Sequence, residues 1–300
     1  MLVTNENIVL TIDERCGILQ QLVRLDIYAK DLNVDYAIPD TIEGVKITSI
    51  ASCFCKSHFD KITIPDSVTS VCESAFKGAT VKEVVWSSSC SVIPERCFVS
   101  SNITKISNIE HVKSIGECAF TGSHIDTIEW PSGCCSIPPK CFFLSTLSKI
   151  SNIEHVEAIG ESSFSQTAIE EFVVPPKATS IGEFAFCGCI YLERFVMSDS
   201  ICHIGDSCFA SCRIKEFHWP SKCRAIPQCC FSECADLVSI TIPETVDSIG
   251  KCAFENTNIQ RLDLSGFASV LFGPLAFSGV NKEQVTPPYY MDDKEFEYLF

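Results

Sequence analysis

Long apolar runs and excess positive charge are both missing from this sequence. No run of 18 apolar residues occurs in the 300 residues, so no helix long enough to span a membrane is expected. The first twenty residues lack a basic stretch followed by an apolar one, so we expect no secretory signal and a cytoplasmic location. The formal net charge is −15, which disfavours nucleic acid and anionic membranes as partners because both attract positive patches.

Catalytic motifs are also lacking. The chain contains no G-x-S-x-G, no phosphate-binding P-loop and no H-E-x-x-H. Two of its six histidines, His111 and His155, lie in duplicated copies of the string Ser-Asn-Ile-Glu-His-Val, and a catalytic residue is rarely duplicated in tandem. We therefore expect a non-enzymatic protein with no cofactor and no small-molecule substrate.

Cysteine, in contrast, is abundant, with 20 residues. No C-x-x-C occurs, and the single C-x-x-H (Cys55 to His58) has no second half, although zinc needs four convergent ligands. Eleven cysteines instead occupy repeat positions that hold Ala, Val, Ser or Thr in other copies, as expected of reduced thiols in a core. A metal- or thiol-dependent protein, or a disulfide framework, remains the alternative.

A repeat of 22–23 residues runs through most of the chain. It is marked by the Phe of a recurring string Ile-x-x-x-small-Phe, and we call this residue the marker Phe. The steps between markers are 22 six times and then 23, 22, 23 and 23. The eleven markers are Phe54, Phe76, Phe98, Phe120, Phe142, Phe164, Phe186, Phe209, Phe231, Phe254 and Phe277.

Each repeat has a short alternation of β-branched residues that often ends in Pro, as in Ile62-Thr-Ile-Pro65, followed by Ile-Gly or Ile-Pro. This predicts one strand, a turn and a compact segment in each unit. Stacked units would build a continuous core, so we predict a curved, right-handed repeat solenoid with one parallel β-sheet face. The predicted strand centres are Ile62, Val84, Ile106, Ile128, Ile150, Phe172, Phe195, Phe217, Ile240 and Leu262.

Strings such as Ile115-Gly-Glu-Cys-Ala-Phe120 and Leu237-Val-Ser-Ile-Thr-Ile-Pro243 resemble the BspA-like leucine-rich repeat family. The resemblance covers roughly residues 36–280. It implies a leucine-rich-repeat solenoid without catalytic apparatus, whose relatives include bacterial surface adhesins and surface antigens. Protein binding, as an adhesin, surface antigen or scaffold, is therefore the expected function, and the cell surface is the alternative location.

The two ends of the chain do not show the repeat. We predict that residues 1–35 form an N-terminal cap, that residues 36–280 form the solenoid, and that residues 281–300 form a C-terminal cap or tail. The reason is that the first and last units of an array must cover an open core edge.

Two rows of strand residues are predicted to point away from the core. The row fifteen residues before each marker alternates in charge over much of its length, which favours one strand register. The row thirteen before each marker is mostly uncharged, and a charged border around an uncharged strip is typical of protein interfaces. We predict a partner protein of unknown identity at Glu129, Ser151, Val173, Val196 and His218. The alternative is that Thr and Val merely suit exposed strands.

The row twelve before each marker should face inward, because most copies place Ile, Val or Met there. Asn108, Trp130 and Asn152 share this row in successive repeats. We therefore predict that Trp130 lies between the two asparagines, whose side chains should bond to backbone groups.

Overall fold

The computed structural model describes residues 2–5, 8–13, 18–25, 35–42 and 44–300. The chain forms a β-solenoid of about eleven turns with stacked parallel strands, which confirms the predicted repeat fold. It divides into two compact units. Unit 1 comprises residues 1–134 and 140–153, and unit 2 comprises residues 135–139 and 154–300. The right-handedness and the curvature of the solenoid stay predictions.

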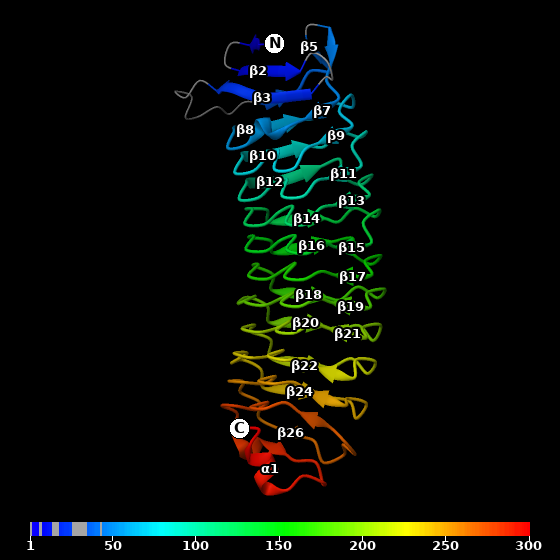
Figure 1. The fold of residues 1–300 in the computed structure, drawn as a ribbon, viewed down its shortest axis with the longest axis vertical. Coiled ribbons are helices and arrows are strands. Elements are labelled where there is room, and N and C mark those ends of the chain that lie inside the picture. The colour runs from blue at the N-terminus through cyan, green and yellow to red at the C-terminus, as the bar shows by residue number, and fades with distance from the viewer. Residues whose placement is uncertain (1, 6–7, 14–17, 26–34, 43) are drawn as a thin grey trace. The chain divides into compact units, whose positions relative to one another are not determined.

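All ten predicted strands are present, and with one further strand at each end they form the first ladder, whose paired strands run parallel. In unit 1 these strands are β4 (Asp35–Ala37), β8 (His58–Thr63), β10 (Thr80–Val85), β12 (Asn102–Ser107), β14 (Thr127–Glu129) and β16 (Lys149–Ser151). In unit 2 they are β18 (Glu171–Val173), β20 (Arg194–Val196), β22 (Glu216–His218), β24 (Ser239–Thr241), β26 (Leu262–Asp263) and β28 (Val285–Thr286). Successive strands lie one above the other within each unit (Figure 1).

A second ladder, which the sequence analysis did not predict, is formed by short strands in each repeat that mostly end at the Ile of the Ile-Gly or Ile-Pro dipeptide. In unit 1 it contains β7 (Ser49–Ile50), β9 (Ser70–Val71), β11 (Val92–Ile93) and β13 (Ser114–Ile115). In unit 2 it contains β15 (Ser136–Ile137), β17 (Ala158–Ile159), β19 (Ser180–Ile181), β21 (His203–Ile204), β23 (Ala225–Ile226), β25 (Ser248–Ile249) and β27 (Leu271–Phe272). Each strand has only two residues, too few for an alternating pattern to be visible in the sequence.

Proline interrupts this second ladder. Where the strand is followed by Gly, that residue donates to the previous turn, as Gly116 N–H does to the Ile93 carbonyl at 2.8 Å. Pro94 and Pro227 occupy the same position after β11 and β23 and have no N–H to donate. Within the described residues, the pairings β9–β11 and β21–β23 are the ones missing inside the two units.

The remaining elements lie toward the ends of the chain. Strand β3 pairs in parallel with β7 and antiparallel with β2. The predicted N-terminal cap at residues 1–35 lies in part outside the described residues. These elements are β1 (Leu2–Asn5), β2 (Ile8–Asp13), β3 (Ile18–Leu25), β5 (Thr41–Ile42), β6 (Val45–Lys46), the 3-10 helices η1 (Ser52–Phe54) and η2 (Lys282–Gln284), and α1 (Asp293–Glu297).

The marker phenylalanines form the core of each unit, and all eleven are fully buried. In unit 1 the ring centroids of successive markers are 5.2 to 5.4 Å apart. In unit 2 they are 5.2 to 5.9 Å apart. Between the first and last markers of each unit, every ring therefore has a marker ring on both sides, as the stacking of repeats required.

The last twenty residues retain two features of a repeat. Phe300 follows Phe277 by 23 residues, and its ring centroid lies 5.7 Å from that of Phe277. Strand β28 extends the first ladder by pairing with β26. Helix α1 begins with a capping box between Asp292 and Glu295 and takes the place of a further second-ladder strand.

The prediction for Trp130 and its neighbouring asparagines is partly right. Trp130 is fully buried, and Asn152 Nδ2 donates to the Trp130 carbonyl at 2.7 Å. Asn108 Nδ2 likewise donates to the Trp86 carbonyl at 2.6 Å. The inward orientation was wrong for the asparagines, because Asn152 is exposed and Asn108 half-buried. Both have a φ near +60°, a left-handed conformation that Asn tolerates and that turns its side chain outward.

Candidate binding surface

The five predicted partner-binding residues all lie on exposed strand positions of the first ladder. In unit 1, Glu129 of β14 pairs with Ser151 of β16. In unit 2, Val173 of β18 pairs with Val196 of β20. His218 lies on β22, where it pairs with Thr241. For Glu129, Val173 and His218 the outward orientation follows from the buried residues on either side, since side chains alternate along a strand.

Val173 and Val196 form an apolar surface in unit 2. Their side chains are 52% and 38% exposed although they lie next to each other on paired strands. Single exposed apolar residues are ordinary, whereas adjoining ones mark a contact surface when charged residues border them.

The charged border is built as predicted, from ion pairs between successive turns. Glu83 lies between Lys61 and Lys105, with nitrogen–oxygen distances of 3.1 and 3.6 Å. It also accepts a hydrogen bond from Ser107 at 2.7 Å. That hydrogen bond first, and then Lys61, lower the pKa of the Glu83 carboxyl group. In unit 2, Arg194 bonds Glu171 at 2.9 Å in the same row.

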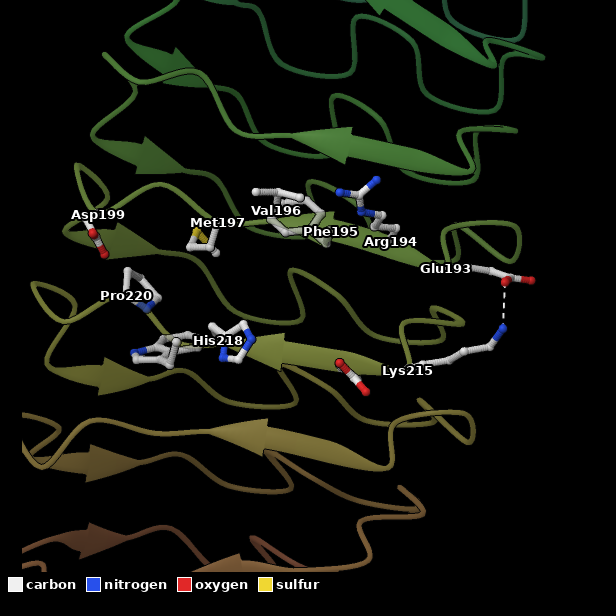
Figure 2. Close-up of a pocket in the computed structure, with 11 residues that line it drawn as sticks. Glu193, Arg194, Phe195, Val196, Met197, Asp199, Lys215, His218 and Pro220 are labelled. Carbon is white, nitrogen blue, oxygen red and sulfur yellow. Dashed lines mark hydrogen bonds and ion pairs between the residues drawn. The ribbon is translucent and has the colours of Figure 1, made fainter.

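Strands β20 and β22 lie on successive turns but are not paired, and a groove of about 550 Å³ opens between them. We call it the β20–β22 groove. Its lining includes the two predicted residues Val196 and His218, together with Met197, Trp219 and Pro220. Figure 2 shows Val196, Met197 and His218 along the groove, with the Glu193–Lys215 ion pair at one end and Asp199 at the other.

A second groove, of about 540 Å³, lies in unit 1 between the unpaired strands β12 and β14. We call it the β12–β14 groove. The predicted residue Glu129 lines it, together with Glu110, Trp130 and Pro131. The sequence analysis missed both grooves. Their signal is the dipeptide Trp-Pro, which occurs in this sequence only at 130–131 and 219–220.

Buried thiols donate hydrogen bonds inside the core. Cys189, Cys212 and Cys234 donate their S–H groups to the carbonyls of Phe164, Phe186 and Phe209 at 3.0 to 3.1 Å. Burial raises the pKa of the Cys189 thiol to about 11 and that of Cys234 to about 12. Such thiols are protonated at neutral pH and are poor nucleophiles and metal ligands.

The described residues contain no cluster of three or more His, Cys, Asp or Glu side chains able to hold a metal ion. Nor does any helix within this part of the chain have the length and apolar character needed to cross a membrane.

Regular turns, a column of marker phenylalanines and an outward strand face define a leucine-rich-repeat solenoid. The family described as "BspA type Leucine rich repeat region" matches residues 48–169 and 157–283 in six copies. The chain belongs to this family, as its repeat strings indicated. Proteins of this family typically serve as binding scaffolds without catalytic activity.

Solved structures show the same fold. A leucine-rich repeat protein from Bacteroides ovatus is 18% identical, with a TM-score of 0.64 over 92% of each chain. The pneumococcal vaccine antigen PcpA is 17% identical, with a TM-score of 0.51 over 93% of this chain and 79% of its own. Among curated proteins, none is similar to this chain at a significant level.

Proposed function

We propose that the chain is a non-enzymatic protein-binding solenoid whose partner is a protein that contacts the outward face of the first ladder. The partner would contact Glu129, Ser151, Val173, Val196 and His218. The observation that carries this proposal is the adjoining pair Val173 and Val196, which is exposed on paired strands beside the Glu171–Arg194 ion pair.

Interface physics supports this choice. Protein interfaces lose charge at the centre and keep it at the rim. Removing two adjoining valines from water favours association by roughly 25 cal/mol for each Å² of apolar surface. The ion pairs that border the valines are already satisfied within the chain, so a partner would not have to strip water from unpaired charges there.

A random-peptide library displayed on phage tests the proposal without a known partner. Peptides selected on the wild-type chain should lose binding to the double variant Val173→Asp, Val196→Asp, because two carboxylates would replace the apolar centre. The matched control is Val92→Asp, a change at an exposed valine of the second ladder. Peptides that bind the double variant as well as the wild type would contradict the proposal.

The variants must also be folded for this test to be read. All three valines are exposed, so each substitution should change the free energy of unfolding by no more than about 1 kcal/mol. Thermal unfolding of the double variant and of the control measures this directly.

We further propose that residues 1–35 and 281–300 cover the two open ends of the array, with the solenoid at 36–280 between them. Pairing of β3 with β7 and the contact of Phe300 with Phe277 support this. Removing residues 281–300 would expose the ring of Phe277, which is fully buried. The truncated chain should therefore aggregate or lose stability, as size-exclusion chromatography and thermal unfolding would show.

The location proposed for this protein is a reducing compartment such as the cytoplasm. Some buried thiols occupy repeat positions that hold Ser or Thr in other turns. Cys189, for example, lies three residues after its marker, as Ser101 does, and the Ser101 hydroxyl donates to the Phe98 carbonyl at 2.7 Å. Denatured protein should then show about 20 titratable thiols. Far fewer thiols would favour the cell surface instead.

A further inference from the structure

The two first-face grooves are built from equivalent repeat positions. In each, the downstream turn supplies Trp-Pro, at Trp130-Pro131 and at Trp219-Pro220. The upstream strand supplies a basic residue fifteen before its marker, Lys105 in one groove and Arg194 in the other. Unit 1 and unit 2 therefore each contain one copy of the same groove.

The basic residues in these grooves are already engaged. Lys105 lies 3.6 Å from Glu83, and Arg194 lies 2.9 Å from Glu171. In the β20–β22 groove, Lys215 is likewise paired with Glu193 at 2.7 Å. The positive charges are thus neutralised within the chain.

The acidic residues that line the grooves are available. Glu110 and Asp199 occupy the same repeat position, ten before the marker, and both are exposed. Each groove has one more such carboxylate, Glu129 in the β12–β14 groove and Glu216 in the β20–β22 groove. Across the described residues, none of these four carboxylates has an ion-pair partner.

The tryptophans do not serve as stacking platforms. Trp130 is fully buried and Trp219 is 4% exposed. Their indole Nε1–H groups donate inward, to the carbonyls of Cys134 and Cys223, both at 2.9 Å. A sugar or a base that binds by stacking on an indole would find no free ring face here.

We propose that each groove binds an extended, basic segment of a partner protein, so that one chain binds two such segments. Lysine or arginine side chains of the segment would bond Glu110 and Glu129 in one groove, and Asp199 and Glu216 in the other. An apolar side chain between them would contact Met197 or Val196 in unit 2 and Ile106 in unit 1. This inference rests on the proposed protein-binding function and specifies the chemistry of the partner.

The charge of the whole chain supports a basic ligand. A net charge of −15 accelerates the approach of a cationic partner. Each exposed carboxylate should contribute up to about a fivefold gain in affinity when it pairs with a lysine.

Isothermal titration calorimetry with the synthetic peptide acetyl-Gly-Lys-Leu-Lys-Leu-Lys-Gly-amide tests the proposal. The expected stoichiometry is two peptides per chain. Glu110→Gln with Glu129→Gln should remove one of the two binding events, and Asp199→Asn with Glu216→Gln should remove the other. Glu157→Gln is the control, since that residue is exposed but lines neither groove.

Two further peptides isolate the two parts of the chemistry. Replacing every Lys by Glu should abolish binding, and replacing every Leu by Ser should weaken it several-fold. Raising the salt from about 0.05 M to about 0.5 M should weaken the lysine peptide, because screening acts on exposed charges.

The outcomes separate this inference from the function on which it rests. A stoichiometry of one, or lysine-peptide binding that survives both pairs of substitutions, overturns the two-groove proposal. If the peptides selected on phage require Val173 and Val196 but contain no excess of Lys or Arg, the basic-segment proposal fails while the binding face stands. Selected peptides that ignore the two valines overturn the binding face itself.

Discussion

Unit 1 and unit 2 share one fold but fill their cores with different side chains. Fourteen residues before the marker, unit 1 places aliphatic residues in the turns of Phe76 to Phe142, whereas unit 2 places Phe172, Phe195 and Phe217 in three successive turns. Each of these rings meets the marker of its own turn at 4.8 to 4.9 Å in an edge-to-face arrangement. Unit 2 therefore has two aromatic columns where unit 1 has one, and the repeat accommodates both.

The polar groups of the two cores differ in the same way. In unit 1 the carbonyls of Phe54 and Phe98 accept from Ser57 and Ser101, both at 2.7 Å. In unit 2, Thr167 and Thr257 donate in the same way to the markers of their own turns, at 2.8 and 2.9 Å. Cys189, Cys212 and Cys234 donate instead to the marker carbonyls of the preceding turn, at 3.0 to 3.1 Å. Sulfur is larger and softer than oxygen, so the thiols fill space beside the extra rings while still satisfying the carbonyls. The same row of side chains therefore both fills core volume and donates hydrogen bonds to the marker carbonyls.

Alkaline pH should separate the two units most strongly. Burial raises the pKa of more thiols in unit 2 (Cys187, Cys189, Cys208, Cys212, Cys223, Cys230, Cys234 and Cys252) than in unit 1 (Cys53, Cys90, Cys97 and Cys141). The unfolded chain then loses protons first, so the free energy of unfolding falls as the pH rises above about 9. Unit 2, which holds more of these thiols, should therefore lose more of its free energy of unfolding than unit 1 between pH 8 and pH 10.

Urea denaturation at pH 8 and pH 10 measures this difference. A variant that keeps only Trp219 reports on unit 2, and one that keeps only Trp130 reports on unit 1, since both indoles are buried. An equal shift of the two midpoints would show that the extra thiols of unit 2 do not set its alkaline stability.

Truncation of a marker ring should have the next largest effect. Phe120→Ala in unit 1 and Phe209→Ala in unit 2 should each cost about 3–5 kcal/mol by leaving a cavity. Phe209 should lie at the upper end, because its ring contacts four aromatic neighbours and that of Phe120 contacts two. Urea midpoints measure both, and unchanged midpoints would contradict the stacked core.

Exchanging the two core patterns tests the comparison directly. Phe195→Leu should cost about 2 kcal/mol, since it gives up edge-to-face contacts with Phe186 and Phe209. The reverse change, Ile106→Phe in unit 1, should cost about 1–3 kcal/mol by overpacking. If Ile106→Phe proves stabilising in thermal unfolding, unit 1 has room for a second aromatic column and the contrast between the units is weaker than described.

The smallest difference should come from the charged rows. Glu83→Gln removes a carboxylate with three partners, 26% exposed, and should cost about 1 kcal/mol. Glu171→Gln breaks a single exposed pair and should cost no more than about 0.5 kcal/mol. Because the pKa of Glu83 is lowered, its contribution is present above the ordinary range of Glu and is lost as the pH falls. Thermal unfolding at pH 7 and pH 3 should show the Glu83→Gln effect only at pH 7.

Much of the fold could be predicted because the pattern that encodes it recurs. A single Phe repeated every 22–23 residues located the core, and the alternation around residues such as Ile62 and Phe172 located ten first-ladder strands but not β4 or β28 at its ends. The second ladder could not be predicted, since two-residue strands such as Ser114–Ile115 leave no period to detect. Their formation depends on the neighbouring turn, through bonds such as Gly116 N–H to the Ile93 carbonyl.

The exposed positions of the candidate site followed from alternation along the strands, whereas the grooves did not. Val173 and Val196 lie outward as an alternating strand requires. The grooves depend on which successive strands remain unpaired, a property of the folded ladder. Asn108, which follows β12, is an example. It adopts a left-handed conformation, its side chain donates to the Trp86 carbonyl, and β12 is not paired with β14. No hydropathy pattern encodes such a local choice.

The two prolines that interrupt the second ladder have a mechanical consequence. A solenoid held by its ends bears tension through the hydrogen bonds between turns, much as a spring bears it through its coils. At Pro94 and Pro227 one such bond is missing on one side, while the marker rings still stack across the same turns at 5.3 and 5.5 Å. Under load the second ladder should part first at these coils, so an optical trap should record yielding in steps that Pro94→Gly and Pro227→Gly shift to higher force.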